Sequence, residues 1–434
     1  MEHSLVTIIC VVVLVVLLLI GCPIFVSLGI TSILGIFLLE GFLGLSRVPA
    51  SIFTHIDNFV LLAVPLFLLM GQTLFISGIG SDLFIAGSKW LAGLKGQLAM
   101  GSVIACAVFG AMSGISVVGA ATIGAFAIPE MVKAKYHPRL AAGTVAAAGA
   151  LSILIPPSII FIIYGGIADV SVAKLFIGGI VPGIVLALLM CAFVWLWVKK
   201  YPWIAPETGV RVSFKERVYS LKRLWPALIL IFLCLITIYI GVCTPTEAGA
   251  LGAFGAIVVG IFFYHSLNYE AFRKLFADTA RVTGAVLIIV CFGSVFSSLL
   301  AMLRLPDKLA EFAISSGLSR WGFIVLINLI LIVLGMFVDA ASAVIITTPI
   351  VLPTIIGFGF DPLWYGIILA INMEMAVITP PVGLNLYVIK SICPEISLED
   401  IIRGAVPFVI VECICLAIFV IFEDLTLWLP GHMR

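Results

Sequence analysis

Long apolar runs separated by short polar segments make up most of this chain. A membrane-spanning helix needs about 20 predominantly apolar residues. The runs that meet this requirement predict ten spans. They lie near 4–21, 24–43, 59–77, 139–168, 173–198, 224–243, 246–265, 283–303, 363–390 and 399–423.

Two further apolar segments, 97–132 and 320–357, are too long for one span, and each is broken near its middle. The breaks read GAMSGISVVGA and GMFVDAASA, where glycine and small polar residues interrupt the apolar pattern. Irregular backbone at membrane depth is tolerated only where protein buries it or where it lines a cavity. We therefore expect two re-entrant hairpins, each of which enters and leaves the membrane on one side.

Three amphipathic stretches, 80–96, 268–281 and 304–319, are too polar to cross a membrane. Helices of this kind lie in the membrane interface. We expect three surface helices, which either tie a mobile part of the protein to a static part or simply connect neighbouring spans.

Composition agrees with a membrane protein. The 434 residues are 63% hydrophobic and 10% charged, with a mean hydropathy of +1.31, whereas soluble domains are about 45–50% apolar and about 25% charged. The net charge of +1 gives no indication of nucleic-acid binding. The sequence contains no C-x-x-C, H-E-x-x-H, G-x-S-x-G or Walker A motif, which argues against an intramembrane enzyme and against direct use of ATP.

The distribution of lysine and arginine predicts which loops are cytoplasmic, because positively charged loops stay on that side. With the 199–223 loop in the cytoplasm, 17 of the 23 basic residues fall on the cytoplasmic side. The six outside are Arg47, Lys174, Arg304, Lys308, Arg320 and Arg434. If either hairpin were a full span, every later segment would change sides and the bias would be lost. Both termini are therefore predicted to lie outside.

The two halves of the chain share a pattern. Asp82 and Asp307, Gly110 and Gly335, Thr122 and Thr347, and Pro182 and Pro407 are each separated by 225 residues, and two Pro-Pro pairs are separated by 224. Each half has five spans and one hairpin in the same order, so the second half is inverted relative to the first. The predicted fold is an all-α polytopic membrane protein with two inverted-topology repeats, an architecture typical of secondary transporters.

The Pro-Pro pairs, Pro156–Pro157 and Pro380–Pro381, interrupt apolar spans. Proline lacks the N–H that would bond to the carbonyl four residues earlier, so the pairs free carbonyls at 152–153 and 376–377. Free carbonyls at membrane depth are costly, and a small hard cation takes oxygen ligands. A kink healed by neighbouring helices is the alternative. With the hairpin tips, the candidate cation ligands are Ser113, Gly114, Ser116, Ser152, Leu154 and Pro157 in one half, and Val338, Asp339, Ser342, Ala376, Val377, Thr379 and Pro381 in the other.

Three stretches carry a family resemblance: ILIPPSIIFIIYGGIADVSVAKLFIGGIVPG, TPTEAGALGA and ITPPVGLNLYVIKSI. They resemble the large membrane subunit of tripartite ATP-independent periplasmic (TRAP) transporters, of the DctM and SiaM type. The resemblance covers essentially the whole chain. It implies a sodium-coupled elevator in the bacterial inner membrane that takes up an organic carboxylate, either sialic acid or a four-carbon dicarboxylate. It also implies two partners, a small membrane subunit of the DctQ or SiaQ type and a periplasmic substrate-binding protein of the DctP or SiaP type.

Since the chain begins directly at its first span, we expect the small subunit to be a separate chain. Sodium would then be the cation at the two candidate sites. A carboxylate transporter that works without a binding protein, driven by sodium or protons, is the alternative function, and an ion channel is disfavoured by the paired hairpins.

Few charged residues lie within the apolar segments, so helix N-termini and hydroxyls are expected to hold an anionic substrate. The candidate substrate-binding residues are Ser116, Ser158, Ser342, Glu374, Thr379 and Asn385. Asp339 either favours a cation or caps a helix. Glu374 either lines the cavity or pairs structurally, and Glu412 is expected to contact another helix or the partner subunit.

Irregular backbone must be buried in protein, whereas intact apolar helices can face lipid, and this difference divides the chain into a moving core and a static frame. We expect a transport core at 97–168 and 320–390. The scaffold is expected at 1–77, 169–265 and 391–434, and the arms at 78–96 and 266–319.

Overall fold

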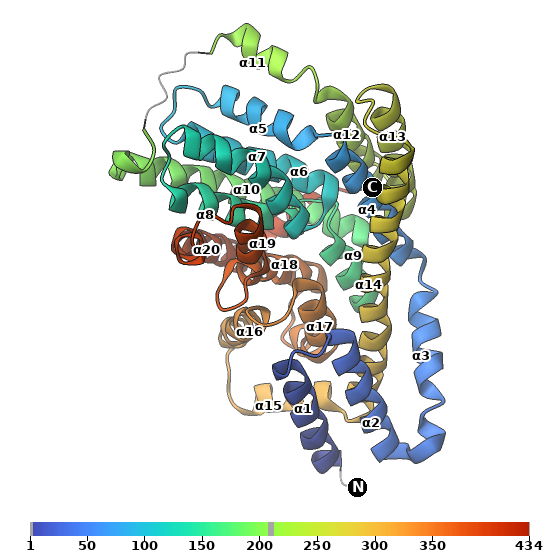
Figure 1. The fold of residues 1–434 in the computed structure, drawn as a ribbon. Coiled ribbons are helices and arrows are strands. Elements are labelled where there is room, and N and C mark those ends of the chain that lie inside the picture. The colour runs from blue at the N-terminus through green and yellow to red at the C-terminus, as the bar shows by residue number, and fades with distance from the viewer. Residues whose placement is uncertain (1–2, 207–211, 434) are drawn as a thin grey trace.

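The computed structural model describes residues 3–206 and 212–433, and these residues form helices and loops without a strand (Figure 1). The protein is an all-α polytopic membrane protein. Eight helices in the described ranges are long and apolar enough to cross a membrane, and they include one helix from each predicted hairpin. Arg211 and Arg434, which the charge count placed inside and outside, lie beyond the described residues.

One group of helices packs around α14. Its members are α1 (His3–Leu19), α2 (Ile24–Gly44), α3 (Arg47–Ile56), η1 (Phe59–Leu62), α4 (Ala63–Ile76), α12 (Trp225–Tyr239), α13 (Pro245–Phe262) and α14 (Tyr269–Met302). The long helix α14 contacts α2, α3 and α4, while α13 packs along α4 and α12 (Figure 1). We call these helices the frame group.

The second group contains both predicted hairpins and both Pro-Pro breaks, and we call it the core group. From the first half it takes α6 (Gln97–Ser113), α7 (Ser116–Lys133), α8 (Pro138–Ala150), η2 (Leu151–Ile153), α9 (Ile159–Ala168) and α10 (Val172–Lys200). From the second half it takes α16 (Arg320–Gly335), α17 (Ala340–Gly357), α18 (Pro362–Ile378), α19 (Leu384–Ile392), α20 (Leu398–Ile421) and α21 (Glu423–Gly431). The order of helical hairpin, broken helix and long helix thus occurs twice.

Short helices connect the groups: α5 (Ile79–Trp90), η3 (Pro202–Ile204), α11 (Phe214–Ser220) and α15 (Leu305–Ser315). Helices are present at two of the three predicted surface stretches, as α5 and α15, and their position along a membrane surface stays a prediction. The third prediction is wrong, because 268–281 is the beginning of the continuous helix α14. Asn268 caps that helix and no proline interrupts it, so its polar first turns and its apolar remainder form one helix. The sequence analysis did not predict α3, α11 or α21.

The packing of α10 and α20 differs from the predicted division into scaffold and core. Both spans were expected in the scaffold, yet α20 packs on α8, α18, α19 and α10, while α10 packs on α21, α20, α6, α18 and α9. The cause is a very close crossing of α8 and α20. A Cβ atom at Gly404 would lie 2.0 Å from the carbonyl oxygen of Arg139, and one at Gly143 would lie 2.2 Å from the carbonyl carbon of Gly404. Small residues let two helices approach this closely.

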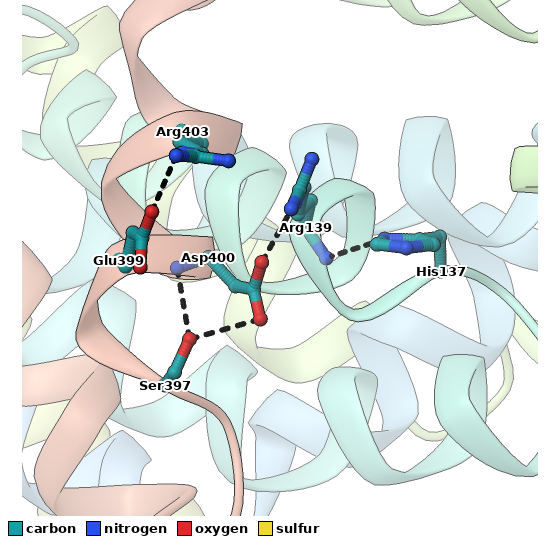
Figure 2. Close-up of polar contacts among 6 residues, drawn as sticks. All are labelled: His137, Arg139, Ser397, Glu399, Asp400 and Arg403. Atoms are coloured by element: carbon teal, nitrogen blue, oxygen red, sulfur yellow. Dashed lines mark hydrogen bonds and ion pairs between the residues drawn. The ribbon is translucent and has the colours of Figure 1, made fainter.

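Polar contacts hold the first turns of α8 and α20 together (Figure 2). Arg139 Nε donates to Asp400 Oδ1 at 2.6 Å, and Ser397 Oγ donates to Asp400 Oδ2 at 2.9 Å. His137 Nδ1 accepts from the backbone N–H of Arg139 at 3.2 Å. Both first turns were predicted on the cytoplasmic side, so this contact agrees with the predicted sidedness.

Other long-range polar contacts also join residues predicted on one side. Arg223 and Asp82 (3.4 Å) are both predicted inside, whereas Ser51 and Ser298 (2.9 Å) are both predicted near the outer surface. Arg320 and Glu423, predicted outside, form an ion pair at 2.5 Å. The inverted orientation of the two halves relative to a membrane stays a prediction.

Candidate functional site

The tip of the first hairpin touches the first Pro-Pro break. Gly114 ends α6 with φ +62°, a conformation that glycine adopts readily, and a Cβ atom there would lie 2.6 Å from the carbonyl oxygen of Pro157. One turn earlier, a Cβ atom at Gly110 would lie 2.9 Å from Ser152 Cα. The tip can therefore reach the break only because these two positions lack side chains.

Two hydroxyl groups at this contact lack hydrogen-bond partners. Ser113 Oγ and Ser152 Oγ are buried without a partner among the described residues. The hydroxyl of Ser152 would lie 2.7 Å from a Cβ at Gly119 on α7, so it points into the hairpin. A buried hydroxyl without a partner is costly. With the Pro157 carbonyl nearby, the donor set is all oxygen, which fits a small hard cation.

One carbonyl that was expected to be free is paired. The Ser158 hydroxyl donates to the carbonyl of Ile153, so Ser158 satisfies the group that the missing proline N–H leaves exposed. The prediction of two free carbonyls before this break is therefore wrong for Ile153. It also means that Ser158, a candidate substrate residue, has an internal partner. The backbone N–H groups of Leu154 and Ile155 both donate to Leu151 O, at 3.2 and 2.9 Å.

The second hairpin tip meets the second break in a similar way. The N–H of Val382 donates to the carbonyl of Met336 at 3.2 Å, and a Cβ atom at Gly335 would lie 2.3 Å from Ala376 Cβ. Asp339 caps α17 by accepting from the backbone N–H of Ser342 at 3.1 Å and from its hydroxyl at 3.0 Å. Of the two interpretations of Asp339, the helix cap is the one observed, and a cation there remains a prediction.

Several oxygens at the second break already have partners. Thr379 donates from its N–H to Ala376 O at 3.4 Å and from its hydroxyl to Met375 O at 2.5 Å. The carbonyl of Pro381 accepts from Tyr387 Oη at 3.2 Å. The carbonyl of Ala376, expected to be free, is therefore weakly paired. The first break offers the better cation site, because its two serine hydroxyls have no partner.

The two halves interlock around the breaks. Helix α19, which follows the second break, packs on α7 of the first hairpin, and α9, which follows the first break, packs on α17 of the second. Asn385 at the start of α19 donates from Nδ2 to Ala146 O on α8 at 3.0 Å, and its buried Oδ1 has no partner among the described residues. Ser116 is buried as the first residue of α7. Four helices thus have their N-termini at the tips and breaks: α7, α9, α17 and α19.

Glu374 does not join this arrangement. On α18, Asn372 donates from Nδ2 to Asn328 Oδ1 on α16 at 2.7 Å. Ala376, one turn later on α18, lies against Gly335 at the end of α16. Glu374 lies about 200° from Asn372 around the helix axis, since each residue turns an α-helix by about 100°. It precedes Met375, whose sulfur atom lies 3.5 Å from that of Cys413, the residue after Glu412 on α20.

Both Glu374 and Glu412 are fully buried, and all four carboxylate oxygens lack partners among the described residues. Glu412 was expected to contact another helix or the partner subunit, and it is buried on α20, which packs on α18. The two carboxylates were considered separately at the sequence level, and the packing of α18 on α20 was not predicted. Their shared feature, a carboxylate in the middle of an apolar helix, was the signal that could have suggested a pair.

A family model and two relatives agree on one family. A family model described as the DctM component of the tripartite ATP-independent periplasmic transporter matches residues 11–425. The C4-dicarboxylate TRAP transporter large permease protein DctM of Pseudomonas aeruginosa is 34% identical over 94% of this chain and 94% of its own. The sialic acid TRAP transporter large permease protein SiaM of Vibrio cholerae is 30% identical over 95% of this chain and 96% of its own. The crystal structure of the Alcanivorax borkumensis YdaH transporter has a similar fold, with a TM-score of 0.66 at 15% identity over 98% of this chain and 99% of that one.

Proposed function

The chain belongs to the DctM component family of tripartite ATP-independent periplasmic transporters and is a multi-pass protein of the inner membrane, and from this premise we propose that it takes up an organic carboxylate together with sodium. We further propose that it does no enzymatic chemistry of its own. The observation that supports this function best is the contact between the first hairpin tip and the first break. Gly114 lies against the carbonyl oxygen of Pro157 there, and the hydroxyls of Ser113 at the tip and Ser152 before the break are buried without partners among the described residues.

The proposed sodium site at this contact uses Ser113, Ser152 and the carbonyl of Pro157. These groups supply neutral oxygen ligands, so the positive charge of the ion stays uncompensated within the site. Such a charge at the tips favours an anion nearby, and the N-termini of α7, α9, α17 and α19 carry partial positive charge as well. Binding of sodium and of a carboxylate would therefore reinforce each other, which is the thermodynamic requirement for coupled uptake.

A second sodium site at 338–342 and 376–381 stays part of the proposal, with weaker support. Asp339 and Ser342 bond to each other there, and Thr379 bonds to the preceding turn. A carboxylate oxygen retains further lone pairs, so Asp339 can cap α17 and ligate a cation at once. We expect the two sites to differ in affinity because only the first has unpartnered hydroxyls.

For the substrate, we propose the class that the relatives share in their names, a carboxylate such as a C4-dicarboxylate or sialic acid. Ser116, the first residue of α7, and Asn385, at the start of α19 with its Oδ1 unpartnered among the described residues, are the candidate substrate residues that we retain. We do not retain Glu374, because it is fully buried within α18 and does not lie at a tip or a break. The periplasmic binding protein and the small membrane subunit are the proposed partners.

For the mechanism, we propose an elevator in which the core group moves against the frame group. The packing extends the moving part beyond the two predicted segments, since α10 and α20 contact core helices along most of their length. The two groups meet where α4 contacts α6 and where α14 contacts α17. Gly71 of α4 lies against Ser113, with a Cβ atom there 2.6 Å from Ser113 Cα, so the first sodium site adjoins this boundary.

A direct test reconstitutes the chain with its small subunit in proteoliposomes and adds the binding protein loaded with carboxylate. Uptake that requires both an inward sodium gradient and the binding protein supports the proposal. Uptake that proceeds equally well from free substrate, without the binding protein, supports the alternative of a carboxylate transporter that works alone. Uptake driven by a proton gradient without sodium would contradict the sodium site.

A further inference from the structure

A cavity of about 810 Å³ lies beside α5, on the side of the protein predicted to face the cytoplasm. It is bounded by α5, the start of α6 and the second half of α7. Its apolar lining comprises Phe84, Ile85, Ala92, Leu98, Ala125, Phe126, Pro129 and Ala134. Its volume falls in the range of about 300–1,000 Å³ that is typical of small-molecule sites.

The opposite face of α5 is also incompletely packed. A second cavity, of about 280 Å³, has an almost wholly apolar lining that includes Leu83, Trp90, Ile104 and Leu228. Residues of α5 alternate between the two cavities, as expected for the two sides of one helix. The helix therefore has room for flexible apolar chains on both sides.

An unpartnered polar group adjoins the larger cavity. Arg217 on α11 donates from Nη2 to the carbonyl of Ala92, a lining residue, at 3.4 Å, and its buried Nε has no acceptor among the described residues. The buried hydroxyl of Ser88 faces the other way, because it would lie 2.6 Å from a Cβ atom at Gly101 of α6. A buried donor without an acceptor is costly, so the guanidinium of Arg217 indicates that something polar belongs here.

The local charge is positive. Lys89 and Lys133 line the cavity, and Arg217 adjoins it. Two acidic residues oppose them: Glu130 pairs with Lys133 at 2.7 Å, and Glu216 interacts with Lys89. Among the described residues, these three cations and two anions leave an excess of one positive charge. The site thus combines apolar walls with a donor-rich, positively charged margin.

We propose that this cavity binds an anionic phospholipid of the cytoplasmic leaflet, with an acyl chain between α5 and α7 and the phosphate near Lys89, Lys133 and Arg217. An acyl chain gains little by moving from the bilayer into an apolar cavity, because both surroundings are equally apolar. Selectivity therefore comes from the headgroup, and each nearby Lys or Arg strengthens binding of an anionic lipid by about fivefold. A free anion would leave the apolar walls unused.

The test uses the assembled transporter in phosphatidylcholine liposomes that contain a small fraction of photoactivatable phosphatidylglycerol. Crosslinked peptides are identified by mass spectrometry. Peptides from α5 and α7 should carry the label, and photoactivatable phosphatidylcholine should label them several-fold less. The double variant K89Q/K133Q should weaken the phosphatidylglycerol labelling about 25-fold, from two charges at about fivefold each.

The variant K174Q/K308Q is the matched control, because it removes two exposed cations that are predicted on the outer side. It should label like the parent chain. A125W, which places a large side chain at the lining position Ala125, should also lose the label. The proposal is wrong if phosphatidylcholine labels α5 and α7 equally well, if K89Q/K133Q labels like K174Q/K308Q, or if inorganic phosphate displaces the lipid.

Discussion

Replacing Gly114 with alanine tests whether the contact between hairpin tip and break binds sodium. Gly114 has φ +62°, and alanine in this left-handed conformation costs about 1–2 kcal/mol. The new Cβ atom would also lie 2.6 Å from the carbonyl oxygen of Pro157, whereas real Cβ contacts are essentially never shorter than 3.0 Å. The tip and the break must therefore separate by at least 0.4 Å, the difference between these two distances.

Gly78 provides a matched control. It has φ +75°, and a Cβ atom there would have no neighbour within 4 Å. G78A therefore pays the backbone cost of G114A without moving the proposed ligands. Comparing the two variants separates loss of stability from loss of the sodium site.

The assay is uptake into proteoliposomes at graded sodium concentrations, with each variant at the same density. G114A should raise the half-saturating sodium concentration about tenfold or more, equivalent to about 1.4 kcal/mol or more, and G78A should leave it unchanged. The midpoint temperature of thermal unfolding should decrease for both variants, and it should decrease further for G114A. If the two variants share the same sodium dependence, the contact at Pro157 does not form the sodium site.

Three further predictions follow from the breaks, the helix crossing and the sidedness. P156A/P157A should abolish sodium-dependent uptake, because a straight helix would no longer hold the carbonyl of residue 157 against Gly114; unchanged sodium affinity and rate would show that these prolines are only kinks. G404A should lower stability by about 1–3 kcal/mol through overpacking, measured by thermal unfolding. G284A, at an open position within α14, should instead raise it by about 0.5–1 kcal/mol, and equal effects would refute the close crossing. A cysteine in place of Lys215 should react with a membrane-impermeant thiol reagent only after sealed cells are opened, and labelling of intact cells would reverse the topology.

The length of apolar runs located most of the long helices, although α3, α11 and α21 were not predicted. The helix pairs α6–α7 and α16–α17 and both breaks occur where the sequence placed them, because glycine at the tips and proline at the breaks act locally on the backbone. That the two pairs are re-entrant stays a prediction. The error at 268–281 has a local cause as well. A change from polar to apolar composition marks where a helix enters the membrane and does not mark where a helix ends. A proline would have indicated an end, and none lies between Asn268 and Met302.

Packing partners were harder to predict. Gly143 and Gly404 are far apart in the sequence, and nothing local indicates that their backbones touch. The partner of the Ser158 hydroxyl depends on its rotamer, so the sequence did not reveal that it satisfies the carbonyl of Ile153. The burial of Glu374 and Glu412 likewise depends on how α18 and α20 are rotated against each other.

In the proposed function, sodium drives uptake of a carboxylate delivered by a binding protein. The most direct test is uptake of labelled carboxylate into proteoliposomes that contain both membrane subunits and loaded binding protein, with external sodium replaced by choline at constant membrane potential. We predict that the replacement reduces uptake at least tenfold (about 1.4 kcal/mol or more) and that sodium enters with the substrate. Uptake that continues at the same rate in choline would contradict sodium coupling.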